Sequence, residues 1–182
     1  MSESCVGNTV FFDVETQYLA DEVGGWDFIH RMKLAAAVSY STADGAFRWY
    51  TEETVDDLIA ELRAADLVVG YNVLRFDYTV LSAYTEHPLH RRPTVDLLAH
   101  LYNTLGFRLK LDNVAQATLG ISKSADGIQA VRWYRQGALD KVLAYCQQDV
   151  EITRQLYEFG RERGYVQYLD KRWRLQRVPV RW

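Results

Sequence analysis

Short apolar runs in which alternate residues share a face recur along the first half of the chain and indicate β-strands. The predicted strands cover residues 10–14, 34–40, 47–51 and 67–71, and a short fifth strand begins the segment 94–106. The sequence "STADGA" between the second and third strands contains Asp and Gly side by side, which is typical of a tight turn.

Helical periodicity, in which apolar residues recur every three or four positions, marks further segments of the chain. The expected helices cover residues 54–65 with Thr54 as the N-cap, the rest of 94–106, the segment 111–120, and a long stretch from Leu139 to near Gly164. Beyond the long helix, the alternating sequences "YVQYL" and "WRLQRVPV" predict a C-terminal β-hairpin laid over the sheet.

Composition favours a single domain over residues 1–182, because 48% of the residues are hydrophobic and no linker-like run divides the chain. The N-terminus has no signal-peptide pattern, and no apolar run is long enough to cross a membrane. Cys5 and Cys146 fit neither a disulfide framework nor a zinc pattern. These features predict a reducing, cytoplasmic setting with no membrane partner.

Three separated strings of residues carry the candidate chemistry. Asp13 and Glu15 alternate with apolar residues on the first strand, so both carboxylates point to one face. Asp77 opens a helical stretch after the strand at 67–71. Tyr145 and Asp149 lie four residues apart on the long helix and therefore share a face. Alone, each acid is equally consistent with a polar strand end, a helix cap or a solvated residue.

Together these strings resemble the DEDD superfamily of 3′→5′ exonucleases, in the branch whose third motif is Tyr-x-x-x-Asp, here Tyr145 to Asp149. The sister branch has a histidine five residues before the last aspartate, where this chain has Ala144. The second motif, "YNVLRFD", is similar to the exonuclease domain of family B DNA polymerases and to small stand-alone bacterial domains. The resemblance covers roughly residues 10–164 and implies a ribonuclease-H-like α/β fold with a mixed central sheet flanked by helices.

The resemblance also implies the chemistry, which is hydrolysis of a phosphodiester bond at a 3′ end with two Mg²⁺ or Mn²⁺ ions. The implied metal ligands are Asp13, Glu15, Asp77 and Asp149. Tyr145 is expected to orient the attacking water, since its ordinary pKa of about 10 makes it a weak base. Contacts to the terminal nucleotide are expected from Thr16, Asn72 and Phe76.

The charge of the chain is −3, which by itself argues against a nucleic-acid partner. Without the four charges of the expected ligands, however, the remaining charge is +1. The extension 164–182 is basic, and Trp173 and Trp182 lie among its charged residues. This combination suits a single strand of nucleic acid, because cations contact the phosphates and aromatic rings stack on the bases. The predicted substrate is thus a single-stranded or frayed 3′ end, with DNA favoured over RNA by resemblance and any polymerase or helicase partner unidentified.

Two alternatives stay open at this point. The chain can be a different enzyme of the same fold, such as a metal-dependent endonuclease, or a non-catalytic module that binds nucleic acid or a protein partner. Among weaker candidates, Asp96 is expected to cap the helix that follows it and to support the site indirectly. Lys110 and Lys123 are expected to be solvated, and Gly24 to Trp26 to form a rim near the cleft.

Overall fold

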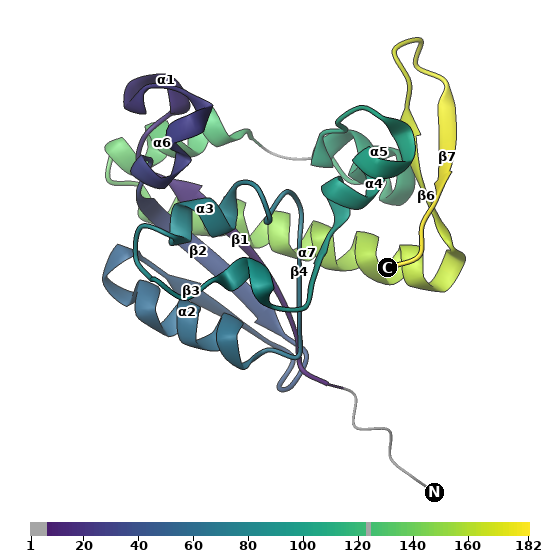
Figure 1. The fold of residues 1–182 in the computed structure, drawn as a ribbon. Helices are drawn as coiled ribbons and strands as arrows, with labels where there is room; N and C mark the ends of the chain where they lie inside the picture. The colour runs from purple at the N-terminus through teal and green to yellow at the C-terminus, as the bar shows by residue number, and fades with distance from the viewer. Residues whose placement is uncertain (1–6, 123–124) are drawn as a thin grey trace, which may run out of the picture.

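The strands predicted from the sequence form one mixed sheet in the order β3–β2–β1–β4–β5 (Figure 1). The five strands are β1 (Thr9–Thr16), β2 (Leu34–Ser41), β3 (Ala46–Tyr50), β4 (Leu67–Gly70) and β5 (Thr94–Asp96). Strand β1 is central, antiparallel to β2 and parallel to β4. This computed structural model describes residues 7–122 and 125–182, so the predictions for Cys5 and Lys123 lie outside the described residues.

Helices cover both faces of the sheet because the residues of β1 alternate between two apolar clusters. Phe12 belongs to one cluster, together with residues of α2 (Val55–Ala64) and α3 (Asp77–Leu81). Phe11 belongs to the other, together with residues of α4, α5 and α7. These helices are α4 (Leu97–Leu105), α5 (Leu111–Leu119) and α7 (Leu139–Arg163). The structure thus confirms the ribonuclease-H-like α/β architecture with a mixed sheet flanked by helices.

The predicted helices are present with small changes at their ends. A glycine directly follows each of α4, α5 and α7, at Gly106, Gly120 and Gly164 respectively. Each has a positive φ, which is the left-handed backbone conformation common at the C-terminal end of a helix. Thr54 precedes α2, but its side chain does not cap the helix. Instead Thr54 belongs to the 3₁₀ turn η2 (Glu52–Thr54), and its hydroxyl oxygen accepts the backbone N–H of Thr51 over 3.0 Å.

The sequence did not predict the short helices α1 (Ala20–Val23) and α6 (Gly127–Arg135), nor the 3₁₀ turns η1 (Trp26–Arg31) and η3 (Leu89–Arg91). Helix α6 packs against α7 and β1. Its first residue is a glycine, which is a poor helix former, and it is only nine residues long, so it was not recognised although its apolar residues recur with helical spacing. The Asp126 side chain nevertheless caps it by accepting the N–H of Gln129.

The expected C-terminal hairpin is present, but its expected position over the central sheet is wrong. Strands β6 (Tyr165–Leu169) and β7 (Leu175–Pro179) form a separate antiparallel two-stranded sheet beside α5 (Figure 1). The Asn113 side chain of α5 exchanges two hydrogen bonds with the backbone of Leu169, at 2.7 and 2.9 Å. These bonds satisfy the outer edge of β6, which explains why the hairpin attaches to a helix.

The long helix α7 runs along the sheet and connects it to the hairpin (Figure 1). The indole N–H of Trp182 donates to the backbone oxygen of Tyr157 on this helix over 2.9 Å. The end of the chain is therefore attached to the same helix that carries Tyr145 and Asp149. Within residues 7–122 and 125–182, no helix combines the length and the apolar character needed to cross a membrane.

Candidate metal site and adjoining pocket

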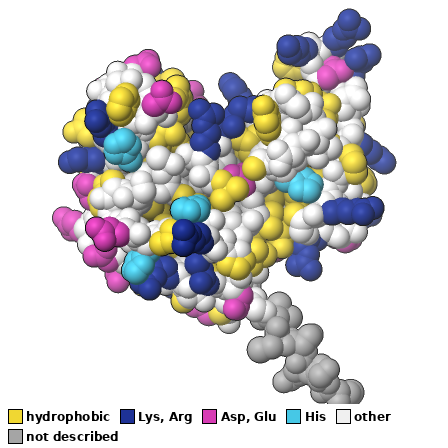
Figure 2. Space-filling view, in the orientation of Figure 1, with side chains coloured by type: hydrophobic (Ala, Val, Ile, Leu, Met, Phe, Trp, Pro, Cys, Tyr) yellow, Lys and Arg dark blue, Asp and Glu magenta, His cyan; other side chains and the backbone are white. Residues whose placement is uncertain are grey.

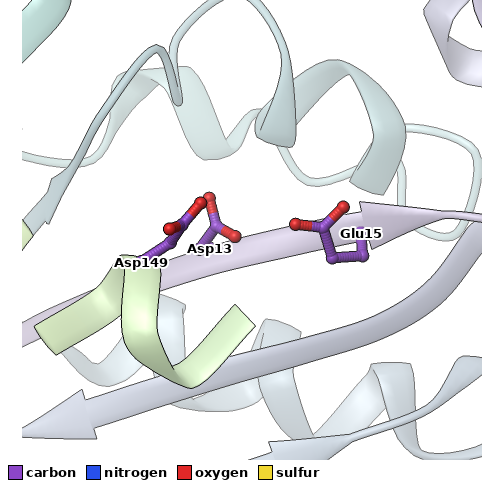
Figure 3. Close-up of side chains that lie close together, drawn as sticks. All are labelled: Asp13, Glu15 and Asp149. Carbon is purple, nitrogen blue, oxygen red and sulfur yellow. The ribbon is translucent and has the colours of Figure 1, made fainter. Parts of the chain in front are cut away.

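Three of the predicted carboxylates meet where β1 passes α7. Asp13 and Glu15 lie on the face of β1 that packs against α7, and Asp149 comes from the facing side of the helix (Figure 3). One oxygen from each of these three residues lies within 4.8 Å of the others. The pairing of β1 with β2 shifts register directly after Glu15, where Ala35 of β2 is left without a partner in the register. Both acids thus lie in the regularly paired part of β1.

The fourth predicted carboxylate, Asp77, is not part of this group of three. It lies at the first turn of α3 and is almost fully buried, with 1% of its surface exposed. Its Oδ1 accepts the backbone N–H of Val14 over 2.9 Å, so it touches the strand between the residues Asp13 and Glu15. Burial raises the pKa of Asp77 well above its usual range, and the nearby Asp13 charge raises it further. Asp77 is therefore an electrostatic neighbour of the group.

Tyr145 lies one helical turn before Asp149 and is also buried. Burial raises the pKa of Tyr145 far above its ordinary value, and the charges of Asp149, Glu15 and Asp13 act in the same direction. The Tyr145 ring meets the Trp133 ring edge-on, with 6.4 Å between the ring centroids. Helix α6, which supplies Trp133, thus holds the tyrosine beside the carboxylates.

Cys146 is fully buried, as its position on the apolar stripe predicted, but it also contacts the carboxylate group. Its Sγ lies 3.2 Å from the backbone oxygen and 3.4 Å from the carboxylate Oδ2 of Asp13. Burial and the Asp13 charge raise the pKa of the Cys146 thiol well above its usual range. The thiol thus acts as a weak donor that supports the position of Asp13, a role that the sequence did not reveal.

The donor set suits a hard divalent cation. Carboxylate oxygens are the ligands that Mg²⁺ and Mn²⁺ prefer, and three negative side chains so close together repel one another unless positive charge lies between them. Glu151, which forms a second Asp-x-Glu sequence with Asp149, is not part of this donor set. Glu151 is three residues from Arg154 on α7 and forms a two-bond ion pair with it. The Glu151 carboxylate is thus engaged in an ion pair along α7.

A pocket of about 300 Å³ contains two of the three predicted substrate contacts. Its lining residues are Trp26, Ile29, Asn72, Arg75, Phe76 and Arg108. Asn72 has a left-handed backbone, with φ of 71°, and its side-chain oxygen accepts a hydrogen bond from Arg108 over 2.7 Å. Phe76 lies beside Trp26, with 6.4 Å between the ring centroids. The pocket thus combines two aromatic rings with two guanidinium groups.

The third predicted contact, Thr16, does not line this pocket. Thr16 is buried at the end of β1, and its hydroxyl donates to the backbone oxygen of Tyr18 over 3.0 Å. Asp96 caps α4 by accepting the N–H of Ala99, as predicted. Asp96 also accepts the N–H groups of Asn72 and Leu74, and these bonds fix the turn that presents Asn72.

Sequence reasoning missed Arg75 and Arg108 and placed Trp26 only on a rim near the cleft. Arg75 was visible inside the second motif, where it separates Asn72 from Asp77. Arg108 follows the end of α4 by only a few residues, and no pattern in the sequence relates it to Asn72. Its contribution follows from the path of the α4–α5 connection, which brings it to within hydrogen-bonding distance of that side chain.

Comparisons with known proteins agree with the fold. The chain matches the family model of the RNase_H superfamily over residues 10–159. No curated protein matches the chain. Among solved structures, the family B DNA polymerase of the hyperthermophilic archaeon Pyrobaculum calidifontis is similar, with a TM-score of 0.64 and 19% sequence identity. That match covers 85% of this chain and 24% of the polymerase chain. The family match spans most of the sequence, and the chain therefore belongs to the RNase_H superfamily.

Proposed function

We propose that this chain is a metal-dependent 3′→5′ exonuclease that removes nucleotides from the 3′ end of DNA, in preference to RNA, in the cytoplasm. The observation that carries the proposal is the group formed by Asp13, Glu15 and Asp149, whose oxygens lie within 4.8 Å of one another beside Tyr145. Membership of a nuclease-rich superfamily and the three sequence motifs support it. The preference for DNA rests on the resemblance of the second motif to polymerase exonuclease domains.

In this proposal Asp13, Glu15, Asp77 and Asp149 hold two divalent ions, either Mg²⁺ or Mn²⁺. When bound, such ions lower the pKa of a water molecule and offset the charge that develops on the leaving 3′ oxygen. Asp77 is close enough to Asp13 for its pKa to be raised by the Asp13 charge, which supports its inclusion with the other three. Tyr145 positions the attacking water through its hydroxyl group rather than removing a proton from it.

The pocket lined by Asn72 and Phe76 would hold the terminal nucleotide. At about 300 Å³ it lies at the lower end of the range for small-ligand sites, which suits one nucleotide rather than a longer segment. The rings of Trp26 and Phe76 offer faces for a base, and Arg75 and Arg108 offer donors for phosphate oxygens. Thr16 remains a proposed contact, near the end of the strand that carries Glu15.

A time course on labelled oligonucleotides tests the proposal. Single strands of DNA and RNA, labelled at the 3′ or the 5′ end, are incubated with Mg²⁺, Mn²⁺ or a chelator. A 3′→5′ exonuclease releases mononucleotides at once from the 3′ label, shortens the 5′-labelled strand stepwise, and leaves a circular strand intact. Cleavage of the circle would instead establish an endonuclease. Strand binding without cleavage under every metal condition would indicate a non-catalytic module.

A further inference from the structure

A second and larger pocket lies between the α4–α5 connection and the turn of the C-terminal hairpin. Its volume is about 950 Å³, and its walls come from residues within 107–116 and 168–174. The two walls are fixed to each other by the hydrogen bonds between Asn113 and Leu169. Neither wall contributes to the carboxylate group, so this pocket is distinct from the candidate metal site.

The pocket is positively charged although the chain as a whole is not. Its lining includes five basic and two acidic side chains. The basic residues are Arg108, Lys110, Lys171, Arg172 and Arg174. One of the acids, Asp170, already accepts hydrogen bonds from the backbone of Arg172 and from the side chain of Arg174 within the turn. Figure 2 shows Lys and Arg side chains gathered at the free end of the hairpin. The site therefore favours a polyanion.

Aromatic rings accompany these charges. Trp173 is 80% exposed at the hairpin turn, and Phe107 is 46% exposed on the opposite wall. Trp173 has a left-handed backbone, with φ of 59°, which is unusual for a bulky residue. The backbone N–H of Trp173 donates to the backbone oxygen of Asp170, and this bond stabilises the turn that exposes the ring. Exposed rings among cations form the surface on which unpaired bases stack.

Arg108 connects this pocket to the smaller one. It lines both pockets and donates to the side chain of Asn72. A strand whose last nucleotide occupies the small pocket would therefore meet the larger pocket with its preceding nucleotides. We propose that the larger pocket binds the single-stranded DNA segment on the 5′ side of the terminal nucleotide. This inference rests on the proposed function and adds the requirement for an unpaired segment several nucleotides long.

The hairpin offers a matched pair of double variants to test the inference. Lys171→Gln with Arg172→Gln removes two charges from the pocket wall, and neither side chain has a hydrogen-bond or ion-pair partner among the described residues. Arg177→Gln with Arg181→Gln removes two charges from the same extension outside the pocket, where Arg177 lies over the Tyr165 ring. Both variants change the net charge equally, so nonspecific electrostatics affects them alike. Trp173→Ala tests the stacking contribution separately.

Binding of labelled oligo(dT) of 3 and 12 nucleotides to the full chain is measured by fluorescence anisotropy, with chelator present to prevent cleavage. For the 12-mer we expect the pocket variant and Trp173→Ala each to raise Kd about tenfold, and the outer variant to change it less than twofold. The slope of log Kd against log salt should decrease by about 1.4 in the pocket variant. The trimer has only two nucleotides beyond the terminal one and so makes fewer contacts with the larger pocket, and its Kd should change much less in the pocket variant than that of the 12-mer.

Equal effects of the two double variants on the 12-mer would overturn the inference, and so would equal effects of the pocket variant on both oligonucleotide lengths. If the pocket variant binds the 12-mer as well as the native chain does, and the native chain binds an acidic peptide tightly, the pocket would instead be assigned to a protein partner. Hydrolysis of the trimer with Mn²⁺ is measured in parallel in each form. A native chain that binds the 12-mer through the pocket but hydrolyses nothing would refute the proposed function and leave the pocket assignment standing.

Discussion

The backbone N–H of Val14 donates to the Asp77 carboxylate over 2.9 Å, and this bond joins the first turn of α3 to the strand that carries Asp13 and Glu15. The parallel pairing of β1 with β4 extends only as far as Phe11. Beyond that point the strand needs another acceptor on the same edge, and Asp77 provides one. A single buried side chain thus supplies an acceptor to β1 beyond its pairing with β4 and places a fourth carboxyl group beside the other three.

Separate replacements of Asp77 distinguish these two roles. Asp77→Ala leaves the buried Val14 N–H without its acceptor, so we expect the free energy of unfolding to fall by about 1–3 kcal/mol. Asp77→Asn keeps an oxygen acceptor and removes the repulsion with Asp13, so its stability should equal or exceed that of the native chain. If Asp77 is a metal ligand, both variants lose at least about a hundredfold in kcat. Urea titrations and 3′-end hydrolysis rates check both expectations, and full activity of Asp77→Asn would exclude the ligand role.

Divalent metal should stabilise the fold through the carboxylate group. A ligand at a hundred times its Kd adds about 2.7 kcal/mol to the free energy of unfolding, which raises Tm by roughly 5–10 °C for a chain of this size. We expect such a rise with Mn²⁺ in the native chain and a much smaller one in Asp13→Ala. Glu162→Ala removes an exposed carboxylate outside the group and serves as the control. Equal shifts in all three proteins would contradict the metal assignment.

The sequence predicts most of the sheet and the candidate site because both depend on local patterns. Apolar alternation in β1 places Asp13 and Glu15 on one face, and helical spacing places Tyr145 and Asp149 together. The position of Arg108 beside Asn72 depends on the path of a loop, and no periodic pattern in the sequence indicates that path. The hairpin likewise shows its own amphipathic pattern, but that pattern does not specify whether its partner is the sheet or α5. That residues 1–182 form one domain stays a prediction.

Docking of the C-terminus should depend on the absence of a side chain at Gly160. A Cβ at this position on α7 would lie 2.4 Å from the Trp182 ring, too close for the ring to remain in place. Gly160→Ala should therefore destabilise the native chain, although alanine ordinarily favours a helix by about 0.5–1 kcal/mol. In a Trp182→Ala background the same substitution should become stabilising. Urea titrations of the four proteins in this double-mutant cycle measure the coupling, and additive effects would exclude the contact.

His100 should make stability depend on pH through its contact with the same tryptophan. The His100 and Trp182 rings meet edge-on, with 5.2 Å between centroids, and burial lowers the pKa of His100 below its ordinary value of 6.5. Between pH 7.5 and 5.5 the unfolded chain then binds more protons at this residue than the folded chain, so stability falls as pH falls. His100→Asn should show a smaller loss over this interval in urea titrations. An unchanged loss would assign the pH dependence to other groups.

Tyr145→Phe should separate catalysis from metal binding. The phenylalanine ring can still pack against Trp133, and all the carboxylates are retained, so fold and metal response should both survive. The substitution removes only the hydroxyl group, which hydrogen-bonds to Asp149 and which in the proposed mechanism positions the attacking water, and we expect a decrease in rate of about 10²–10⁴. Asp149→Ala, one turn away on the same helix, should lose both the activity and the Tm rise with Mn²⁺. Single-turnover hydrolysis and melting curves distinguish the two patterns. A fully active Tyr145→Phe protein would remove the tyrosine from the mechanism and assign the positioning of the water to another group.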